Sequence, residues 1–225
     1  MTMKILALDT STEYCSVALL IGDTLLTRDI LAGQRHSGLL VPLVGEVLAE
    51  GGVSLPELDG IAFGSGPGSF TGLRIGCGVV QGLAFGADLP VLGICTLLAL
   101  AEGSEAERVV ACLDARMGEV YHAVYEKVDG AWQELIAPGL YAPADLPLPP
   151  GEGWVGCGSG FAAYGDALRQ RHGGCLSQVL PDAPPRARDI ARLAAPLLER
   201  GAGMDAAQAA PLYIRNKVAL KTSER

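Results

Sequence analysis

Ile5-Leu6-Ala7-Leu8-Asp9-Thr10-Ser11-Thr12 is the stretch that decides the fold, because Val109-Val110-Ala111-Cys112-Leu113-Asp114 repeats its pattern further along the chain. Each stretch is a short apolar run that ends in an aspartate and a small turn, which indicates a buried strand. A β-rich run follows each aspartate, at residues 15–31 and 119–136. The sequence therefore predicts one structural unit written twice.

Both copies continue with alternating helices and strands. In the first copy we expect strands at 15–21, 25–31, 60–64 and 91–94 and helices at 38–50, 69–86 and from residue 96. In the second copy we expect strands at 119–127, 132–136 and 154–157 and helices at 160–172 and 188–200. An antiparallel meander followed by helix–strand alternation predicts an α/β fold of two ribonuclease H-like lobes, in the architecture of the actin-like ATPases, with mixed sheets flanked by helices.

The lobe boundary is expected in the polar stretch 101–107, which gives lobes at 1–102 and 103–225. The second lobe ends in a basic tail with Arg215, Lys217 and Lys221. This tail either meets only solvent, which we favour, or docks on an anionic partner, and packing back on the first lobe is a third alternative.

Composition limits the classes of protein to which the chain can belong. Its 225 residues are 49% hydrophobic and 19% charged, which is typical of a globular protein. The net charge of -8 argues against unaided binding to nucleic acid. The six cysteines form no C-x-x-C pair, the start of the chain does not resemble a secretory signal, and the apolar stretch 75–101 is interrupted at Gly86–Pro90. We expect a cytoplasmic protein with no membrane segment.

Several catalytic motifs are absent or weak. The glycine-rich run Gly64–Gly76 has no lysine for a nucleotide-binding P-loop, and Ser69 is better explained as a helix N-cap. The three histidines have no metal-ligand spacing, and no serine lies in a G-x-S-x-G elbow. Residues 156–163 contain a G-x-G-x-x-A match, but we expect only a tight strand-to-helix turn because no clean βαβ unit is predicted after them. No catalytic, metal or cofactor residue is therefore predicted.

The two helices of the first lobe are unusual. Gly78, Gly82 and Gly86 repeat at i, i+4, although each glycine in a helix interior costs about 1 kcal/mol relative to alanine. The helix at 38–50 is apolar around most of its circumference. Either both helices are buried within one chain or they form a helix–helix interface with another, and we favour the interface. Its predicted residues are Leu40, Leu43, Val44, Val47, Leu73, Arg74, Gly78 and Gly82.

Five motifs together resemble the bacterial TsaB (YeaZ) family. They are Ile5–Thr12, Arg35-His36-Ser37, Gly66–Gly76, Asp114–Tyr121 and Pro211–Ala219. The resemblance implies a non-catalytic scaffold or activator subunit in the formation of N6-threonylcarbamoyladenosine (t6A) in tRNA. It also implies a heterodimer with TsaD, the catalytic paralogue, through the two helices described above, with the ATPase TsaE joining the pair and a homodimer forming when the chain is alone. Contact with tRNA would be indirect.

The turns after Asp9 and Asp114 set the expectation for cofactors. ATP-using relatives have glycines beside these acids, whereas this chain has Thr10-Ser11-Thr12 and Ala115-Arg116-Met117. We expect no cofactor on the isolated chain, and ATP or ADP only in the assembled complex. The alternatives are a small-molecule kinase of actin-like fold and a peptidase-like activity, although no residue spacing supports a nucleophile–base pair.

Overall fold

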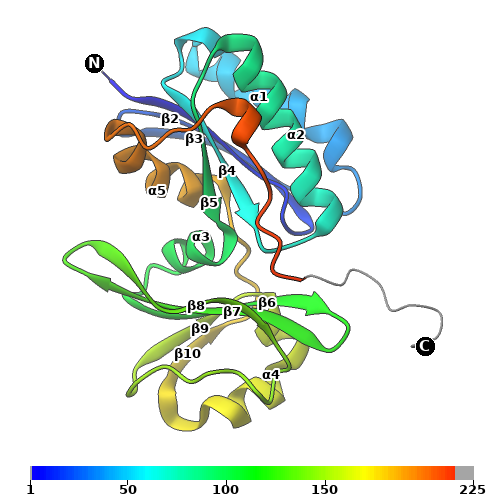
Figure 1. Cartoon of the computed structure of the whole chain (residues 1–225), viewed down its shortest axis with the longest axis vertical. Coiled ribbons are helices and arrows are strands. Elements are labelled where there is room, and N and C mark those ends of the chain that lie inside the picture. The colour runs from blue at the N-terminus through cyan, green and yellow to red at the C-terminus, as the bar shows by residue number, and fades with distance from the viewer. Residues whose placement is uncertain (1, 216–225) are drawn as a thin grey trace.

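The first sheet is built mainly from the first part of the chain. The computed structural model describes residues 2–215, and Figure 1 shows two sheets, one above the other. The first sheet has the strand order β3-β2-β1-β4-β5. Its strands are β1 (Lys4–Asp9), β2 (Tyr14–Ile21), β3 (Thr24–Leu31), β4 (Gly60–Gly66) and β5 (Val91–Cys95). Strands β1, β2 and β3 form an antiparallel meander, whereas β4 pairs in parallel with both β1 and β5.

The second sheet repeats this arrangement. Its order is β10-β9-β6-β7-β8. Its strands are β6 (Arg108–Arg116), β7 (Glu119–Val128), β8 (Ala131–Tyr141), β9 (Trp154–Cys157) and β10 (Leu176–Leu180). When the strands are counted within each half, both sheets have the order 3-2-1-4-5, with the same parallel and antiparallel pairs. The predicted duplication of a ribonuclease H-like unit is confirmed.

Helices cover both faces of the first sheet. Helices α1 (His36–Gly51) and α2 (Phe70–Ala87) pack on the face that carries Leu6 and Leu8. Helix α5 (Ala187–Glu199) packs on the opposite face, which carries Ile5 and Ala7. Successive residues of β1 are therefore buried on opposite sides, which explains why this strand is a continuous apolar run rather than an alternating one.

The lobes exchange their last helices. Helix α3 (Thr96–Gly103) follows β5 along the chain but lies between the two sheets (Figure 1). Its Leu97 and Leu100 pack in the core of the second sheet with residues of β6 and β7, and only Ala99 packs in the core of the first. Helix α5 follows the strands of the second sheet but belongs to the first. The expectation that the range 103–225 forms only the second lobe is therefore wrong for α5, because its apolar stripe fits the open face of the first sheet. The division at 102 and 103 itself stays a prediction.

The second sheet contains a βαβ unit, although none was predicted after residues 156–163. Strand β9, helix α4 (Ser159–His172) and strand β10 form a parallel βαβ unit. The predicted tight turn between β9 and α4 is confirmed: Gly158 has φ 104°, and a Cβ there would overlap the carbonyl oxygen of Cys112. Glycine at this turn therefore allows α4 to pack closely on β6, and no ligand is needed to explain it.

The chain then returns across the first lobe. Short 3-10 turns lie at Leu55–Glu57, Gly173–Cys175 and Ala206–Gln208. Met204 pairs with Val91 at the edge of the first sheet, and the chain beyond it runs along α2 towards the second lobe (Figure 1).

Among residues 2–215, no helix combines the length and the apolar character that crossing a membrane requires.

Candidate functional site

The loop after β1 is closed by the chain's own atoms. Ser11 donates to Asp9 Oδ1 from its main-chain nitrogen (3.1 Å) and from its hydroxyl (2.8 Å). The hydroxyl of Thr10 donates to the carbonyl oxygen of Gly72 at 2.7 Å, and the nitrogen of Ser69 donates to the carbonyl oxygen of Ser11 at 2.7 Å. The main-chain N–H groups of Ser11 and Ser69, which a phosphate would need as donors, are thus already engaged.

The glycines at the start of α2 serve this packing. A Cβ at Gly68 or Gly72 would overlap the carbonyl oxygens of Ser11 and Thr10, and one at Gly76 would lie 2.5 Å from the hydroxyl oxygen of Thr10. The side chain of Ser69 accepts from the nitrogen of Gly72 at 3.3 Å, so the predicted N-cap is confirmed. The first part of the glycine-rich run therefore brings α2 close to the loop after β1.

Asp9 is a buried acid at the end of β1. Asp9 is 1% exposed, and its Oδ2 has no hydrogen-bond partner within residues 2–215. Burial raises the pKa of Asp9 to about 7, against the opposing effect of the hydrogen bonds from Ser11. Gly64 lies directly beside this carboxyl group, and a Cβ there would overlap it.

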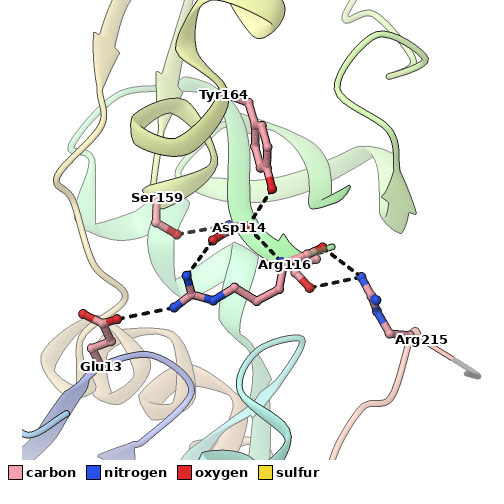
Figure 2. Close-up of polar contacts among 7 residues, drawn as sticks. Glu13, Asp114, Arg116, Ser159, Tyr164 and Arg215 are labelled. Atoms are coloured by element: carbon pink, nitrogen blue, oxygen red, sulfur yellow. Dashed lines mark hydrogen bonds and ion pairs between the residues drawn. The ribbon is translucent and has the colours of Figure 1, made fainter. Parts of the chain in front are cut away.

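The loop after β6 differs in kind, because an arginine occupies it (Figure 2). Arg116 has φ 62° and Met117 φ 58°, left-handed backbone conformations that residues other than glycine rarely adopt. The nitrogen of Arg116 donates to Asp114 Oδ1 at 2.8 Å, and its guanidinium pairs with Asp114 at 3.2 Å and with Glu13 of the first lobe at 3.4 Å. A protein cation therefore bridges the two lobes at the point where their first strands end.

Arg215 holds the same turn from the other side, as Figure 2 shows. It donates to the carbonyl oxygens of Ala115 at 3.0 Å and Arg116 at 3.4 Å, and it pairs with Glu119 at 2.7 Å. The other two predicted tail residues, Lys217 and Lys221, lie outside the described residues. The docking role of the tail stays a prediction, but Arg215 already binds the turn between β6 and β7 of the same chain.

Five of the eight predicted interface residues are buried, so their placement on the surface is wrong. Leu40, Leu43, Val44 and Val47 of α1 lie in the core of the first lobe, as does Leu73 of α2. These five side chains are at most 3% exposed and have no surface to offer a partner. The helix is apolar around most of its circumference, so its sequence alone could not identify the face that meets the sheet.

The other three predicted interface residues lie on the surface. Arg74, Gly78 and Gly82 are exposed, and a Cβ at either glycine would have no neighbour within 4 Å. Two large apolar side chains that the prediction omitted are also exposed: Val41 of α1 (51%) and Phe85 of α2 (83%). Phe85 could have been found from the sequence, because an aromatic residue beside a row of helical glycines has no local reason to be buried.

The second lobe contains a buried histidine pair that the sequence did not single out. The rings of His122 and His172 are 6.2 Å apart, and Nδ1 of His122 lies 3.4 Å from the sulfur of Cys112. Burial lowers the pKa of His122 to about 3 and also lowers the pKa of His172. Residues 2–215 contain no group of three or more histidine, cysteine, aspartate or glutamate side chains placed to hold a metal ion.

Comparison with known proteins gives a consistent result. Residues 30–221 match the model of the family described as TsaD, tRNA N6-adenosine threonylcarbamoyltransferase. The chain is 39% identical to the tRNA threonylcarbamoyladenosine biosynthesis protein TsaB of Escherichia coli, covering 97% of both chains. It is also 39% identical to the TsaB of Haemophilus influenzae, covering 97% of this chain and 96% of that protein. The solved structure of YeaZ from Pseudomonas aeruginosa superposes with a TM-score of 0.87 at 39% identity, covering 94% of this chain and 99% of that one.

Proposed function

The chain belongs to the TsaB family of tRNA threonylcarbamoyladenosine biosynthesis proteins, and we propose that within this pathway it is a non-catalytic scaffold or activator subunit. In this role it pairs with the catalytic TsaD paralogue and supports the binding of TsaE. When it is alone, it pairs with itself through the same face. Tight binding of ATP or ADP is expected only in the assembled complex, and the compartment is the cytoplasm.

The exposed face of α1 and α2 is the observation that carries the proposal. We call the surface formed by Val41, Gly78, Gly82 and Phe85 the α1–α2 face. Open glycines allow another helix to approach the backbone closely, and an exposed phenylalanine offers a large apolar contact beside them. A self-pair and a pair with a paralogue would compete for this one surface, because related lobes present similar patches.

The two loops support a subunit without its own catalysis. A kinase of actin-like fold needs main-chain donors free for phosphates between its lobes. Here the main-chain nitrogens of Ser11 and Ser69 donate to Asp9 and to the carbonyl oxygen of Ser11, and Arg116 occupies the turn of the second lobe. A titration of the pure chain with ATP, followed by calorimetry, should therefore show no saturable binding.

Substitution of one open glycine tests the pairing. Gly78→Leu would place a branched side chain on the α1–α2 face without touching the core, so complex formation with the purified TsaD paralogue should be lost. Gly165→Leu is a matched control, because Gly165 is also helical and open but lies on α4 of the other lobe. Complex formation is read by size-exclusion chromatography with light scattering, and circular dichroism verifies folding.

The two variants are expected to differ in pairing but not in folding. Gly165→Leu must pair like the natural chain, and Gly78→Leu must remain folded but unpaired. Normal pairing of folded Gly78→Leu would remove the α1–α2 face from the interface. Failure of the natural chain to bind the paralogue would remove the subunit role itself.

A further inference from the structure

Arg74 heads the row of open glycines on α2. Arg74, Gly78, Gly82 and Gly86 follow one another at i, i+4, so they lie along one stripe of the helix. The three glycines are open to solvent, and Arg74 is exposed at the end of the stripe. A helix that packs along the glycines would therefore reach the guanidinium of Arg74.

The side chain of Arg74 is held in one position by two aromatic rings. Its guanidinium carbon lies 3.6 Å from the centre of the Phe70 ring. Its Nε donates to the hydroxyl of Tyr213 at 3.0 Å, and the rings of Phe70 and Tyr213 are 5.6 Å apart. Such stacking fixes a long side chain that would otherwise lose much rotamer entropy on binding.

Tyr213 reaches Arg74 because the C-terminal segment 209–215, which we call the strap, is fixed at several points. Gln81 of α2 donates to the carbonyl oxygen of Ala209 at 2.9 Å, and the nitrogen of Leu212 donates to the carbonyl oxygen of Ser65 at 2.7 Å. Arg215 then holds the strap to the turn after β6. The strap therefore spans both lobes and delivers Tyr213 to the start of α2.

The charge of Arg74 is not compensated by the part of the chain that the structure describes. Within residues 2–215 it forms no ion pair, whereas Arg108, Arg186 and Arg215 each contact a carboxylate. A guanidinium has five N–H donors, and the only hydrogen bond that Arg74 forms within residues 2–215 uses Nε. Within the same residues the two terminal nitrogens, which suit a carboxylate in a two-point contact, have no hydrogen-bond partner.

We propose that Arg74, held between Phe70 and Tyr213, is a preformed binding point for a carboxylate of the TsaD paralogue, which covers the α1–α2 face in the complex. This inference rests on the proposed function, because it needs that partner. Arginine and aromatic residues provide most hot spots in protein interfaces, and a side chain fixed in advance loses less entropy when it binds. Tyr213 is a positioning residue, and through it the strap contributes to the partner surface.

A carboxylate suits the site better than a nucleic-acid phosphate. Phosphate backbones are bound by clusters of lysine and arginine, and the chain has a net charge of -8. The side chains that contact Arg74 are the exposed rings of Phe70 and Tyr213, and neither is charged. A single arginine fixed by aromatic rings is typical of a protein interface.

The test is the affinity for the purified TsaD paralogue at low and high salt. Arg74→Gln should weaken binding about tenfold or more and reduce its salt dependence, because one fixed charge pair is lost. Arg74→Lys, which keeps the charge but not the two-point contact, should recover only part of this loss. Tyr213→Phe should weaken binding about threefold, since one hydrogen bond to the guanidinium is removed. Arg200→Gln, the same change of charge at the end of α5, is the control and should bind like the natural chain.

A double-mutant cycle identifies the carboxylate. Each acidic residue on the surface of the paralogue is changed to its amide, and one of these changes should abolish the effect of Arg74→Gln. Normal binding by Arg74→Gln would overturn the inference but leave the proposed function intact, whereas no binding by the natural chain would overturn the proposed function. A gel shift in which Arg74→Gln loses affinity for tRNA but not for the paralogue would also overturn the inference. If circular dichroism shows that Arg74→Gln is unfolded, Arg74→Lys and Tyr213→Phe decide the question.

Discussion

The two lobes share one strand order but differ in what joins their third and fourth strands. In the first lobe this connection is the 16-residue helix α1, which packs beside α2. In the second lobe it is the proline-rich stretch 142–153, and α4 has no such neighbour. The pair of helices with an open glycine row therefore exists in only one of two similar lobes. A duplicated unit therefore has the same sheet in both copies but this helix pair in only one.

Their buried ionisable groups differ as well. The first lobe buries two acids, Asp9 of β1 and Asp189 of α5. Burial raises the pKa of Asp189 to about 6. The second lobe buries His122 and His172, and burial lowers the pKa of both. Acids with raised pKa values favour the folded state at low pH, whereas histidines with lowered pKa values oppose it there. The two lobes should therefore respond to acid in opposite directions.

The largest expected effect distinguishes a buried from an exposed position of α1. Val44→Glu would bury a charge in the core of the first lobe and should lower the free energy of unfolding by about 4 kcal/mol or more. Val41→Glu, one turn away and 51% exposed, should cost no more than about 0.5 kcal/mol and act on partner binding instead. Urea unfolding followed by circular dichroism measures both, and equal losses would show that α1 has no free side.

The next effect is the pH response of the first lobe. The unfolded Asp9 loses its proton near pH 4, but the folded form keeps it up to about pH 7, so stability falls as pH rises through this window. The loss reaches up to roughly 4 kcal/mol at pH 7. Asp9→Asn should remove most of this fall, as measured by urea unfolding at pH 5 and 7.5. Asp23→Asn on the surface is the control, and an unchanged pH profile in Asp9→Asn would contradict the assignment.

The second lobe should respond to acid with the opposite sign. Unfolded His122 takes up a proton below about pH 6.5, whereas the folded form resists protonation down to about pH 3. Stability is therefore lost as pH falls through this window, by about 2 kcal/mol at pH 5. Hydrogen exchange, corrected for intrinsic rates, should show faster opening of β6 and β7 at pH 5 than at pH 7. Slower opening of β6 and β7 at pH 5 would break the comparison between the lobes.

The smallest effect concerns the ionic bridge between the lobes. Arg116 pairs with Glu13, but both side chains are well exposed, so Arg116→Ala should lower stability by about 1 kcal/mol or less, and less still at high salt. Thermal unfolding of Arg116→Ala and Glu13→Gln in 0.05 and 0.5 M salt measures it. A loss of several kcal/mol would mean that this bridge, rather than the exchanged helices, holds the lobes together.

Most of the fold could be predicted from the sequence, because apolar runs and turns give local signals. Strand β10 was missed because Ser177 and Gln178 interrupt its apolar pattern at a sheet edge. The position of α5 was missed for another reason: its apolar stripe predicts that it is half-buried, but no local signal says against which sheet.

The candidate site was less predictable. Gly72 and Gly76 look like Gly78 and Gly82 in the sequence, yet the first two admit a loop of the same chain and the last two face solvent. Likewise, Val41 is 51% exposed and Val44 only 3%, although residues three apart are neighbours on a helix that is apolar around most of its circumference. Only contacts between distant segments, such as Thr10 with Gly72 or Tyr213 with Arg74, distinguish these residues.

The exchange of α3 and α5 also sets an order of events during synthesis. Most of the face of the first sheet that carries Ile5 and Ala7 stays uncovered until α5 has left the ribosome, because α3 adds only Ala99 to its core. At about 5–20 residues per second, translation of the stretch between β5 and α5 leaves this face exposed for roughly 5–20 s. The lobe that is made first is therefore finished last, and a nascent chain that stops before residue 187 has an aggregation-prone sheet instead of a folded lobe.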